Sequence, residues 1–459
     1  MHQLAAGIFV VLIALLFFVE RRAEERTSIA LWIPVLWLMI VGSRPVTLWI
    51  KSAPAFAFAG SFSEGSPVDA AIFGVLFAAG VIALNTRFTR VRLLLRANGP
   101  LLLFFAYCLL SALWSDYSGV ALKRWIKAIG DVVMVLVVLT DPHPQVAIRR
   151  FFYRPAFVLL PMSVILILFF RDMGTMYDPI DMMTYYTGVT TNKNTLGVTC
   201  AACGLGLLWS WIGLYKDRTM RHRTRRLIVN GLLFATALGL ILRANSMTSL
   251  SCLLIGSALM ILTTHRDFVI EKNHLHLLLG AAIGLPVFAL FFDTAGSMVH
   301  SLGRDSTLTG RTDIWRAVLS LHTNSLVGTG FESFWLGNRL QQVWNITLQN
   351  GIQEAHNGYI ELYLNLGWVG LILLGYLIVT GYRHATDAFR LDPHEGRLRL
   401  AFFAACLVYS LTEAGFREMS PIWIGFILAA VLVPRCLQQS AHQPLVMAVS
   451  SAQRVRILQ

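Results

Sequence analysis

Long apolar runs separated by short polar segments make up most of this sequence. A run of roughly 17–25 apolar residues can cross the hydrocarbon core of a bilayer, about 30 Å thick, as a helix. The runs lie near 3–19, 28–42, 68–84, 99–114, 124–139, 155–170, 195–215, 227–242, 248–264, 275–292, 359–382, 399–415 and 421–436. The pattern predicts an all-α polytopic membrane protein with about 12 or 13 transmembrane helices, since a short pair can form a re-entrant element instead.

The longest polar interval divides the predicted helices into two groups. We expect an N-terminal transmembrane bundle of about ten spans over 1–292 and a large, partly helical external loop over 293–358. C-terminal transmembrane helices follow over 359–436, with a cytoplasmic tail over 437–459. No soluble domain of independent size remains.

Composition and charge support this organisation. Of 459 residues, 56% are apolar and 14% charged, which excludes an ordinary soluble domain. Lys and Arg collect in four loops on alternate sides of the spans: 87–96, 149–154, 216–226 and 383–399. Basic loops stay in the cytoplasm, so the loops around 43–67, 171–193 and 293–358 are expected outside. This sorting also explains the net charge of +13 without nucleic acid as a partner.

One predicted span carries charges at membrane depth. Arg124, Lys127 and Asp131 fall on one helical face. Ionisable groups at this depth are costly and usually face the protein interior. Two interpretations stay open: a Lys127–Asp131 pair that fixes helix packing, or a face that lines a substrate cavity.

Two further cations stand at predicted external turns. Lys193 precedes a long apolar helix that Asn194 or Thr195 can cap, and its amine can either reach the interface or contact an anion. Arg243 lies beside the tight turn 242–248 and has no acidic neighbour in sequence. Its partner is therefore a distant part of the protein or a ligand.

The large external loop contains the main candidate for anion binding. Thr312 is the predicted N-cap of a helix over 313–322, which places Arg311 just before a helix N-terminus. Guanidinium groups and free N–H groups at a helix start both favour phosphate oxygens. Arg316 and Arg339 are further candidates for binding a diphosphate or a glycan in this loop. The alternative for Arg311 is a surface pair with an aspartate.

A histidine stands where the loop returns to the membrane. His356, Tyr363, Gly367 and Gly370 have helical spacing, and glycines on this face would let another helix pack closely beneath the histidine. With an ordinary pKa near 6.5, histidine can take a proton from a hydroxyl group at neutral pH. The alternative is a structural histidine at the interface.

Several motifs in this order resemble a known family. They are Thr309-Gly310-Arg311-Thr312-Asp313-Ile314-Trp315, Gly328-Thr329-Gly330-Phe331, Ala355-His356-Asn357-Gly358-Tyr359 with Gly367 and Gly370, and upstream Gly42-Ser43-Arg44-Pro45, Trp114-Ser115-Asp116 and Thr191-Asn192-Lys193-Asn194. This set resembles the O-antigen ligase / Wzy-type polysaccharide polymerase superfamily, in particular its exopolysaccharide-polymerase (ExoQ-like) branch. The resemblance covers most of the chain.

The resemblance implies a GT-C-like, inverting membrane glycosyltransferase. Its donor would be a glycan on undecaprenyl diphosphate, used on the periplasmic face of the bacterial inner membrane, with Arg311 and His356 as the catalytic pair. One departure is visible, because this family often has Ser-Arg/Lys-Thr where this chain has Ser246-Met247-Thr248. Arg243, about one turn earlier, is the candidate substitute.

The sequence is therefore interpreted as an exopolysaccharide polymerase that needs no metal and no cofactor. Its expected partners are the lipid-linked donor, a glycan acceptor, the bilayer, and chain-length regulator and export proteins. An O-antigen ligase that uses a lipid A-core acceptor is the alternative within the family. A transporter of lipid-linked glycan is the alternative of another class. An internal repeat or paired broken helices would favour that class, and the sequence shows neither.

Overall fold

Helices form nearly all of the protein in a computed structural model, which describes residues 2–21, 27–51, 66–178, 182–218, 222–265, 272–291, 309–349 and 351–437. The first half contains α1 (His2–Arg21), α2 (Trp32–Val41), α3 (Val46–Ile50), α4 (Pro67–Asn85), α5 (Phe88–Ala97), α6 (Gly99–Leu110), α7 (Ser118–Leu139), α8 (Pro144–Phe169) and α9 (Arg171–Gly174). The second half contains α10 (Lys193–Lys216), α11 (Arg223–Ala244), α12 (Met247–Leu262), α14 (Lys272–Phe291), α16 (Thr309–Ser320), α17 (Gly337–Thr347), α18 (Gly358–Leu391), α19 (Pro393–Tyr409) and α20 (Pro421–Ala430). Residues 292–308 of the predicted external loop and 438–459 of the predicted tail lie outside the described residues.

The predicted fold class, an all-α polytopic membrane protein, is confirmed. Among the described residues, α4, α8, α10, α11 and α18 are long and apolar enough to cross a membrane singly, and the bent pair of α5 with α6 raises the number from five to six. The other predicted spans are also helices. They are shorter, as in α2, α12 and α20, or carry several charges, as in α7. Apolar length alone therefore supports fewer single spans than the 12 or 13 predicted.

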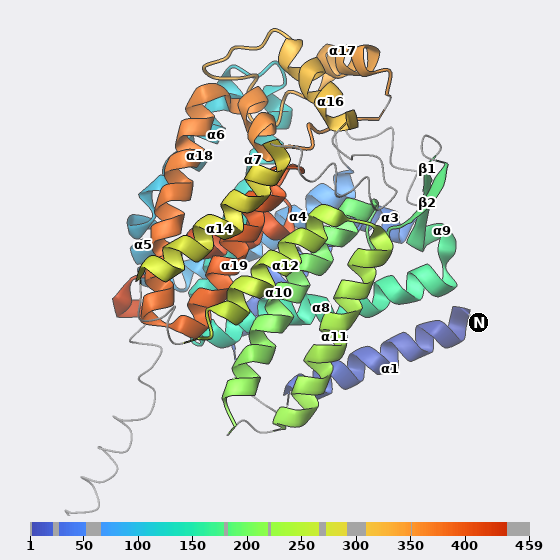
Figure 1. Cartoon of the computed structure of the whole chain (residues 1–459), viewed down its shortest axis with the longest axis vertical. Helices are drawn as coiled ribbons and strands as arrows, with labels where there is room; N and C mark the ends of the chain where they lie inside the picture. The colour runs from blue at the N-terminus through green and yellow to red at the C-terminus, as the bar shows by residue number, and fades with distance from the viewer. Residues whose placement is uncertain are drawn as a thin grey trace, which may run out of the picture.

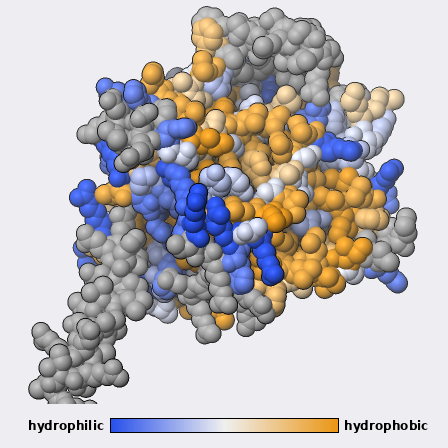
Figure 2. Space-filling view, turned by 60° about the horizontal axis from the view of Figure 1, so that its bottom comes forward, coloured by the Kyte–Doolittle hydropathy of each residue, from blue (hydrophilic) through white to orange (hydrophobic). Residues whose placement is uncertain are grey.

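The small helices α16 and α17 lie together at one end of the bundle (Figure 1). The last turns of α10 and α18 and the first turns of α11 and α19 lie at the opposite end. Apolar residues cover much of the surface in Figure 2. Hydrophilic residues gather near and below the centre of this view. A β-hairpin was not predicted: β1 (Thr175–Asp178) pairs antiparallel with β2 (Met183–Tyr186) in the segment before α10.

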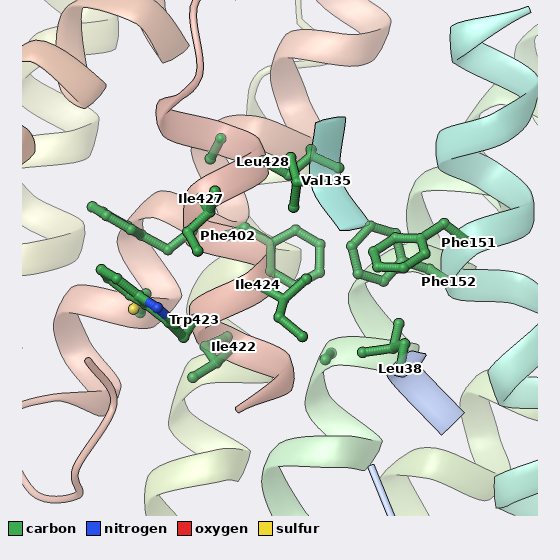
Figure 3. Close-up of a cluster of buried hydrophobic side chains, with 14 of the residues drawn as sticks. Leu38, Val135, Phe151, Phe152, Phe402, Ile422, Trp423, Ile424, Ile427 and Leu428 are labelled. Carbon is green, nitrogen blue, oxygen red and sulfur yellow. The ribbon is translucent and has the colours of Figure 1, made fainter. Parts of the chain in front are cut away.

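The core lies where α20 meets α2, α7, α8 and α19 (Figure 3). All ten residues of α20 are buried, which explains why this helix is apolar on every face. Aromatic rings fill the contact: Phe152 of α8 stacks on Phe402 of α19 with centroids 4.7 Å apart, and Trp423 stacks on Phe426 at 5.2 Å.

The carboxylate of Asp131 in α7 contacts residues of this core and does not pair with Lys127. Its carboxylate accepts hydrogen bonds from Trp37 Nε1 at 2.8 Å and from the backbone N–H of Met419 at 2.9 Å. A buried carboxylate needs such donors, and two distant segments supply them. The Lys127–Asp131 pair is therefore wrong, and Lys127 instead lines a cavity beside α4.

The long helix α18 is broken at Gly367, which has φ +63°. The segment 325–330 packs into the break: Thr329 N–H donates to Leu364 O at 3.1 Å, and Trp368 N–H donates to Ser325 O at 2.9 Å. The expected role of the Gly367 face is thus wrong, because a turn segment and not another helix fills it. His356 does not share this face, since α18 begins only at Gly358.

Two predicted helix starts also shift. The helix expected over 313–322 is α16, which begins at Thr309, so Arg311 stands inside its first turn and Thr312 is not its cap. Helix α10 is capped by Asn192, whose side chain accepts from Thr195 N–H at 2.7 Å, and not by Asn194 or Thr195. The change leaves the Asn194 side chain available for a contact in the site below.

The break at Gly367 generates a first prediction. A Cβ at Gly367 would lie 2.3 Å from the carbonyl carbon of Leu326, and the positive φ alone costs a non-glycine residue roughly 1–3 kcal/mol. Gly367→Ala should therefore clearly lower the melting temperature of the purified protein in detergent. Gly375→Ala in the same helix is the control, because its Cβ meets nothing within 4 Å. Equal melting of the two variants would contradict this account of the break.

Candidate active site

Six ionisable side chains meet where α16, the start of α18 and the turn 410–420 come together. We call this set the charge cluster; it consists of Arg311, Glu332, Glu354, His356, Glu413 and Arg417. With His356 protonated it contains three cations and three carboxylates. Its members come from four separate segments of the chain, so only the tertiary structure assembles it.

His356 and Glu413 form the centre of the charge cluster. His356 Nδ1 lies 3.0 Å from Glu413 Oε2 and 3.1 Å from Glu354 Oε1. Glu413 is only 4% exposed, and its other oxygen accepts from Arg311 Nη2 at 2.6 Å and from Asn194 Nδ2 at 3.1 Å. No described residue hydrogen-bonds to Nε2 of His356, whose side chain is 27% exposed. This nitrogen is thus the one that can meet a substrate.

Arg417 completes the charge cluster on its other side. Its guanidinium lies 3.3 Å from Glu332 and 3.8 Å from Glu354. Arg124 of α7 donates a hydrogen bond to the backbone carbonyl of Glu332, so a second guanidinium group lies nearby. Glu354 therefore bridges Arg417 and His356.

The backbone around His356 shows why this local sequence is needed. Asn357 caps α18 by accepting from Tyr359 N–H at 3.0 Å and Ile360 N–H at 3.1 Å. Gly358 N–H donates to Ser410 O at 2.8 Å, and a Cβ on Gly358 would meet the Ser410 side chain at 3.0 Å. His356 itself has φ +48°. The close approach at Gly358 brings His356 against the turn that carries Glu413.

A buried carboxylate holds the segment just before His356. Glu361, 4% exposed, accepts from Ala355 N–H at 2.9 Å and from Trp335 Nε1 at 2.6 Å. On the other side, Trp315 Nε1 donates to Ala355 O at 2.7 Å. Because the backbone N–H and C=O of Ala355 are both hydrogen-bonded, the backbone next to His356 is held in a fixed position.

The charges shift the pKa values of this site strongly. Burial alone would lower the pKa of His356, but the charges and hydrogen bonds of Glu354 and Glu413 outweigh it and raise the value to about 10. Burial would raise the pKa of Glu354, yet His356, Arg417 and Arg311 lower it to about 2. Without substrate, His356 is therefore an imidazolium at neutral pH. The ordinary pKa near 6.5 assumed from the sequence does not hold here.

Glu354, His356 and Glu413 also have the spacing of metal ligands, with donor atoms within 4.8 Å of one another. The same carboxylates face Arg311 and Arg417. A divalent ion would have to displace the imidazole proton and compete with both guanidinium groups. The residues as placed fit protein cations better than a bound metal.

Lys193, at the start of α10, and Arg243, near the end of α11, each contact a tyrosine of β2. Lys193 Nζ is 3.5 Å from the ring centre of Tyr185, and the Arg243 guanidinium is 5.7 Å from that of Tyr186. Lys193 adjoins Asn194, which contacts Glu413, so the hairpin group borders the charge cluster. Thr248 reaches the same region, with its hydroxyl 2.8 Å from that of Thr412. Met247, which stands where the related family often has Arg or Lys, is 51% exposed.

Arg316 and Arg339 are placed elsewhere in the loop. Arg316 forms an exposed pair with Asp313 at 2.8 Å. Arg339 pairs with Asp116 at 2.6 Å and donates to Ser333 O at 3.2 Å. No ion pair or hydrogen bond between described residues joins either arginine to the charge cluster. Arg311, by contrast, contacts the charge cluster directly through Glu413.

Sequence reasoning missed Glu413, Arg417 and Glu332. A signal for the first two exists, since Glu413 to Glu418 places three charged residues between two strongly apolar runs. Glu413 lies near the end of the predicted span 399–415, and its charge was therefore attributed to a helix end. Glu332 has no such signal, because nothing in its local sequence separates it from an ordinary loop glutamate.

The fold and site define a helical membrane protein with a histidine–carboxylate–arginine cluster at one end of the bundle. Residues 195–375 match the model of the O-antigen ligase family. Over 335 residues, the chain is also 24% identical to the exopolysaccharide production protein ExoQ of Rhizobium meliloti (strain 1021), covering 71% of this chain and 74% of that protein. The resemblance predicted from the motifs is thus confirmed: residues 195–375 match the O-antigen ligase model, and the chain is similar to ExoQ over most of its length. The matched region includes Arg311 and His356 but ends before Glu413.

The raised pKa of His356 predicts a pH-dependent contribution to stability. Because the folded value of about 10 exceeds the unfolded value near 6.5, the imidazolium stabilises the protein fully below about pH 6.5 and loses this effect as pH rises through 10. The loss of melting temperature caused by His356→Gln should therefore be largest at pH 6 and shrink toward pH 10. The exposed His322 in the same loop supplies the control variant, His322→Gln. A His356→Gln effect that is constant over this range would contradict the assigned charge.

Proposed function

We propose that this protein is an inverting glycosyltransferase that polymerises exopolysaccharide from glycan carried on undecaprenyl diphosphate, on the periplasmic face of the bacterial inner membrane. The observation that carries the proposal is His356 held by Glu354 and Glu413, with Arg311 on the same buried Glu413. A base oriented by a carboxylate, next to a guanidinium that suits diphosphate, is what transfer from such a donor needs. The O-antigen ligase domain and the likeness to ExoQ support the same class.

In the proposed reaction, the acceptor hydroxyl attacks the anomeric carbon while the bond from that carbon to the diphosphate oxygen breaks. The hydroxyl proton passes to Nε2 of the neutral His356 ring, whose Nδ1 proton stays hydrogen-bonded to Glu413. The electron pair leaves with the lipid diphosphate, where Arg311 stabilises the charge. Attack from the face opposite the leaving group inverts the anomeric centre.

The other four candidate cations have two different roles in this proposal. Lys193 and Arg243 border the charge cluster at the hairpin and are the better placed to contact diphosphate. Arg316 and Arg339 stand on the loop surface and would contact the glycan instead. Arginine favours such contacts because its planar fork matches phosphate and sugar oxygens.

The proposed reaction needs no metal ion. Arg311 and Arg417 already provide cationic charge at the carboxylates that a metal would use. We therefore expect transfer by the purified protein to survive EDTA. Activity abolished by EDTA and restored by Mg²⁺ would instead assign Glu354, His356 and Glu413 as metal ligands.

Transfer of finished polymer to lipid A-core is the second candidate function, because the matching family model is named for O-antigen ligase. The name of the ExoQ relative favours exopolysaccharide as the product. Chain-length regulator and export proteins would be the partners of a polymerase. A transporter is the weaker candidate, because the matching family model is named for a ligase.

Deletion of the gene should separate the two candidate functions. For a polymerase, secreted exopolysaccharide is lost while the lipopolysaccharide ladder on a gel is unchanged. For a ligase, capped lipopolysaccharide is lost while polymer is still made. A strain that keeps both products would reject the proposed class.

His356 should be required as a base and not only as a charge. His356→Gln keeps a hydrogen-bonding side chain but cannot accept the proton, so the transfer rate should fall about 10²–10⁴-fold. Since Nε2 accepts a proton only in the neutral ring, and the pKa is raised to about 10, the wild-type rate should rise from pH 6 to pH 9. His322→Gln is the control. A rate that falls over this range, or a Gln variant with wild-type activity, would falsify the base role.

A further inference from the structure

A cavity of about 560 Å³ lies beside the charge cluster, on the side away from Arg311. Its walls come from α2, α4, α7 and the turn 410–420. Apolar side chains form one part of the lining, among them Trp37, Ile40, Phe73 and Phe77. Basic side chains form another part: Lys123, Arg124, Lys127 and Arg417. The cavity thus has the two chemical halves of a lipid with an anionic head.

Two lysines of this cavity have no partner among the described residues. Lys123 and Lys127 make no hydrogen bond or ion pair with any described residue. Lys127 does not pair with Asp131, whose carboxylate is occupied by Trp37 and Met419. Cations at membrane depth are costly, so lysines that no described residue neutralises point to an anionic ligand.

The acidic groups that line the same cavity do not neutralise all of its positive charge. Asp69 already accepts from both the N–H and the hydroxyl of Thr47. Burial and the nearby Glu332 raise the pKa of Glu418 to about 8, so this group is mostly neutral at pH 7. Arg417 is already paired with Glu332 and Glu354, so Lys123, Arg124 and Lys127 face the carboxylate of Asp69, and the field in the cavity favours negative charge.

The depth and the side of the basic groups match the head of a lipid. Lys123 and Lys127 lie five and nine residues after the start of α7, roughly 7–14 Å along the helix. That start is on the same end as the charge cluster, because Ser115 bonds to Ser333 at 2.7 Å and Trp114 bonds to Val327 O at 3.2 Å. A head group here would lie near the bilayer surface with its chain against the apolar wall.

The cavity connects to His356 through one chain of contacts. Arg417 lines the cavity and lies 3.8 Å from Glu354, which is 3.1 Å from His356. On the other side, Arg311 reaches His356 through Glu413. Two separate cationic groups therefore flank one histidine, and none of Arg311, Lys193 or Arg243 lines the cavity.

We propose that this cavity is a second lipid site, which binds the diphosphate and first isoprene units of a polyprenyl-diphosphate-linked acceptor. The inference rests on the proposed function, since joining two lipid-linked glycans requires an anion site on each side of the reacting centre. Three basic residues of α7 suit a diphosphate, which carries more charge than a phospholipid phosphate. The acceptor glycan would then extend past Arg417 toward Nε2 of His356.

Binding stoichiometry tests the proposal without relying on activity. Undecaprenyl diphosphate is titrated against the full-length protein in nanodiscs and counted by native mass spectrometry. Wild type should bind two molecules, whereas Lys123→Gln with Lys127→Gln should bind one, as should Arg311→Ala. The matched control is Arg92→Gln with Arg96→Gln, two exposed cations with the same spacing on α5, which should still bind two.

A second variant fills the cavity without changing its charge. Gly74 of α4 lines the cavity, and a Cβ there meets nothing within 4 Å, so Gly74→Phe should fold and also bind one molecule. Gly239→Phe on α11, equally open, is its control and should bind two. Two molecules bound to both cavity variants, or only one to wild type, would overturn the second site.

The lipid composition identifies the ligand. Excess phosphatidylglycerol in the nanodisc should leave the second undecaprenyl diphosphate bound. Displacement by phosphatidylglycerol at comparable concentration would make the cavity a general phospholipid site and reject the proposal. Failure of the proposed function itself would appear differently, as two bound lipids in wild type together with unchanged polysaccharide in the deletion strain.

Discussion

The carboxylate of Glu413 is the contact on which the site depends. It is almost fully buried, and it receives Arg311 from α16, Asn194 from α10 and His356 from the segment before α18. A buried charge is tolerated only when it is paired and hydrogen-bonded, so each of these elements is held in place by the need to satisfy it. Removing any one partner would leave charge in a poorly solvated place, and the other elements would have to move.

The same electrostatics give the site two sides. Glu413 connects His356 to Arg311, and Glu354 connects it to Arg417. Both arginines are neutralised by carboxylates in the absence of substrate, which lowers the cost of holding them near the membrane. In the proposed reaction, an arriving diphosphate takes the place of these carboxylates at the two guanidinium groups. The cavity beside Arg417 extends this arrangement to a second anion.

Rigidity around the histidine comes from backbone contacts and not from the membrane helices alone. Glu361 and Trp315 fix the two backbone groups of Ala355, and Gly358 rests on Ser410. The break in α18 at Gly367 ties the same helix to the segment 325–330, which leads to Glu332. Local strain at positive φ thus occurs at positions that support the site, as expected where surrounding contacts hold such conformations in place.

The sequence by itself determined the helical membrane fold and singled out Arg311 and His356 in the polar interval between two groups of apolar runs. Apolar run length and local motifs carry this information, because each depends on residues close together in the chain. Only the tertiary structure decided that Glu413, Arg417 and Glu332 surround His356, that its pKa is therefore raised, and that Asp131 bonds to Trp37 and leaves Lys127 in a cavity. These outcomes depend on contacts between residues far apart in sequence, and charge pairing across such distances leaves no local pattern to read.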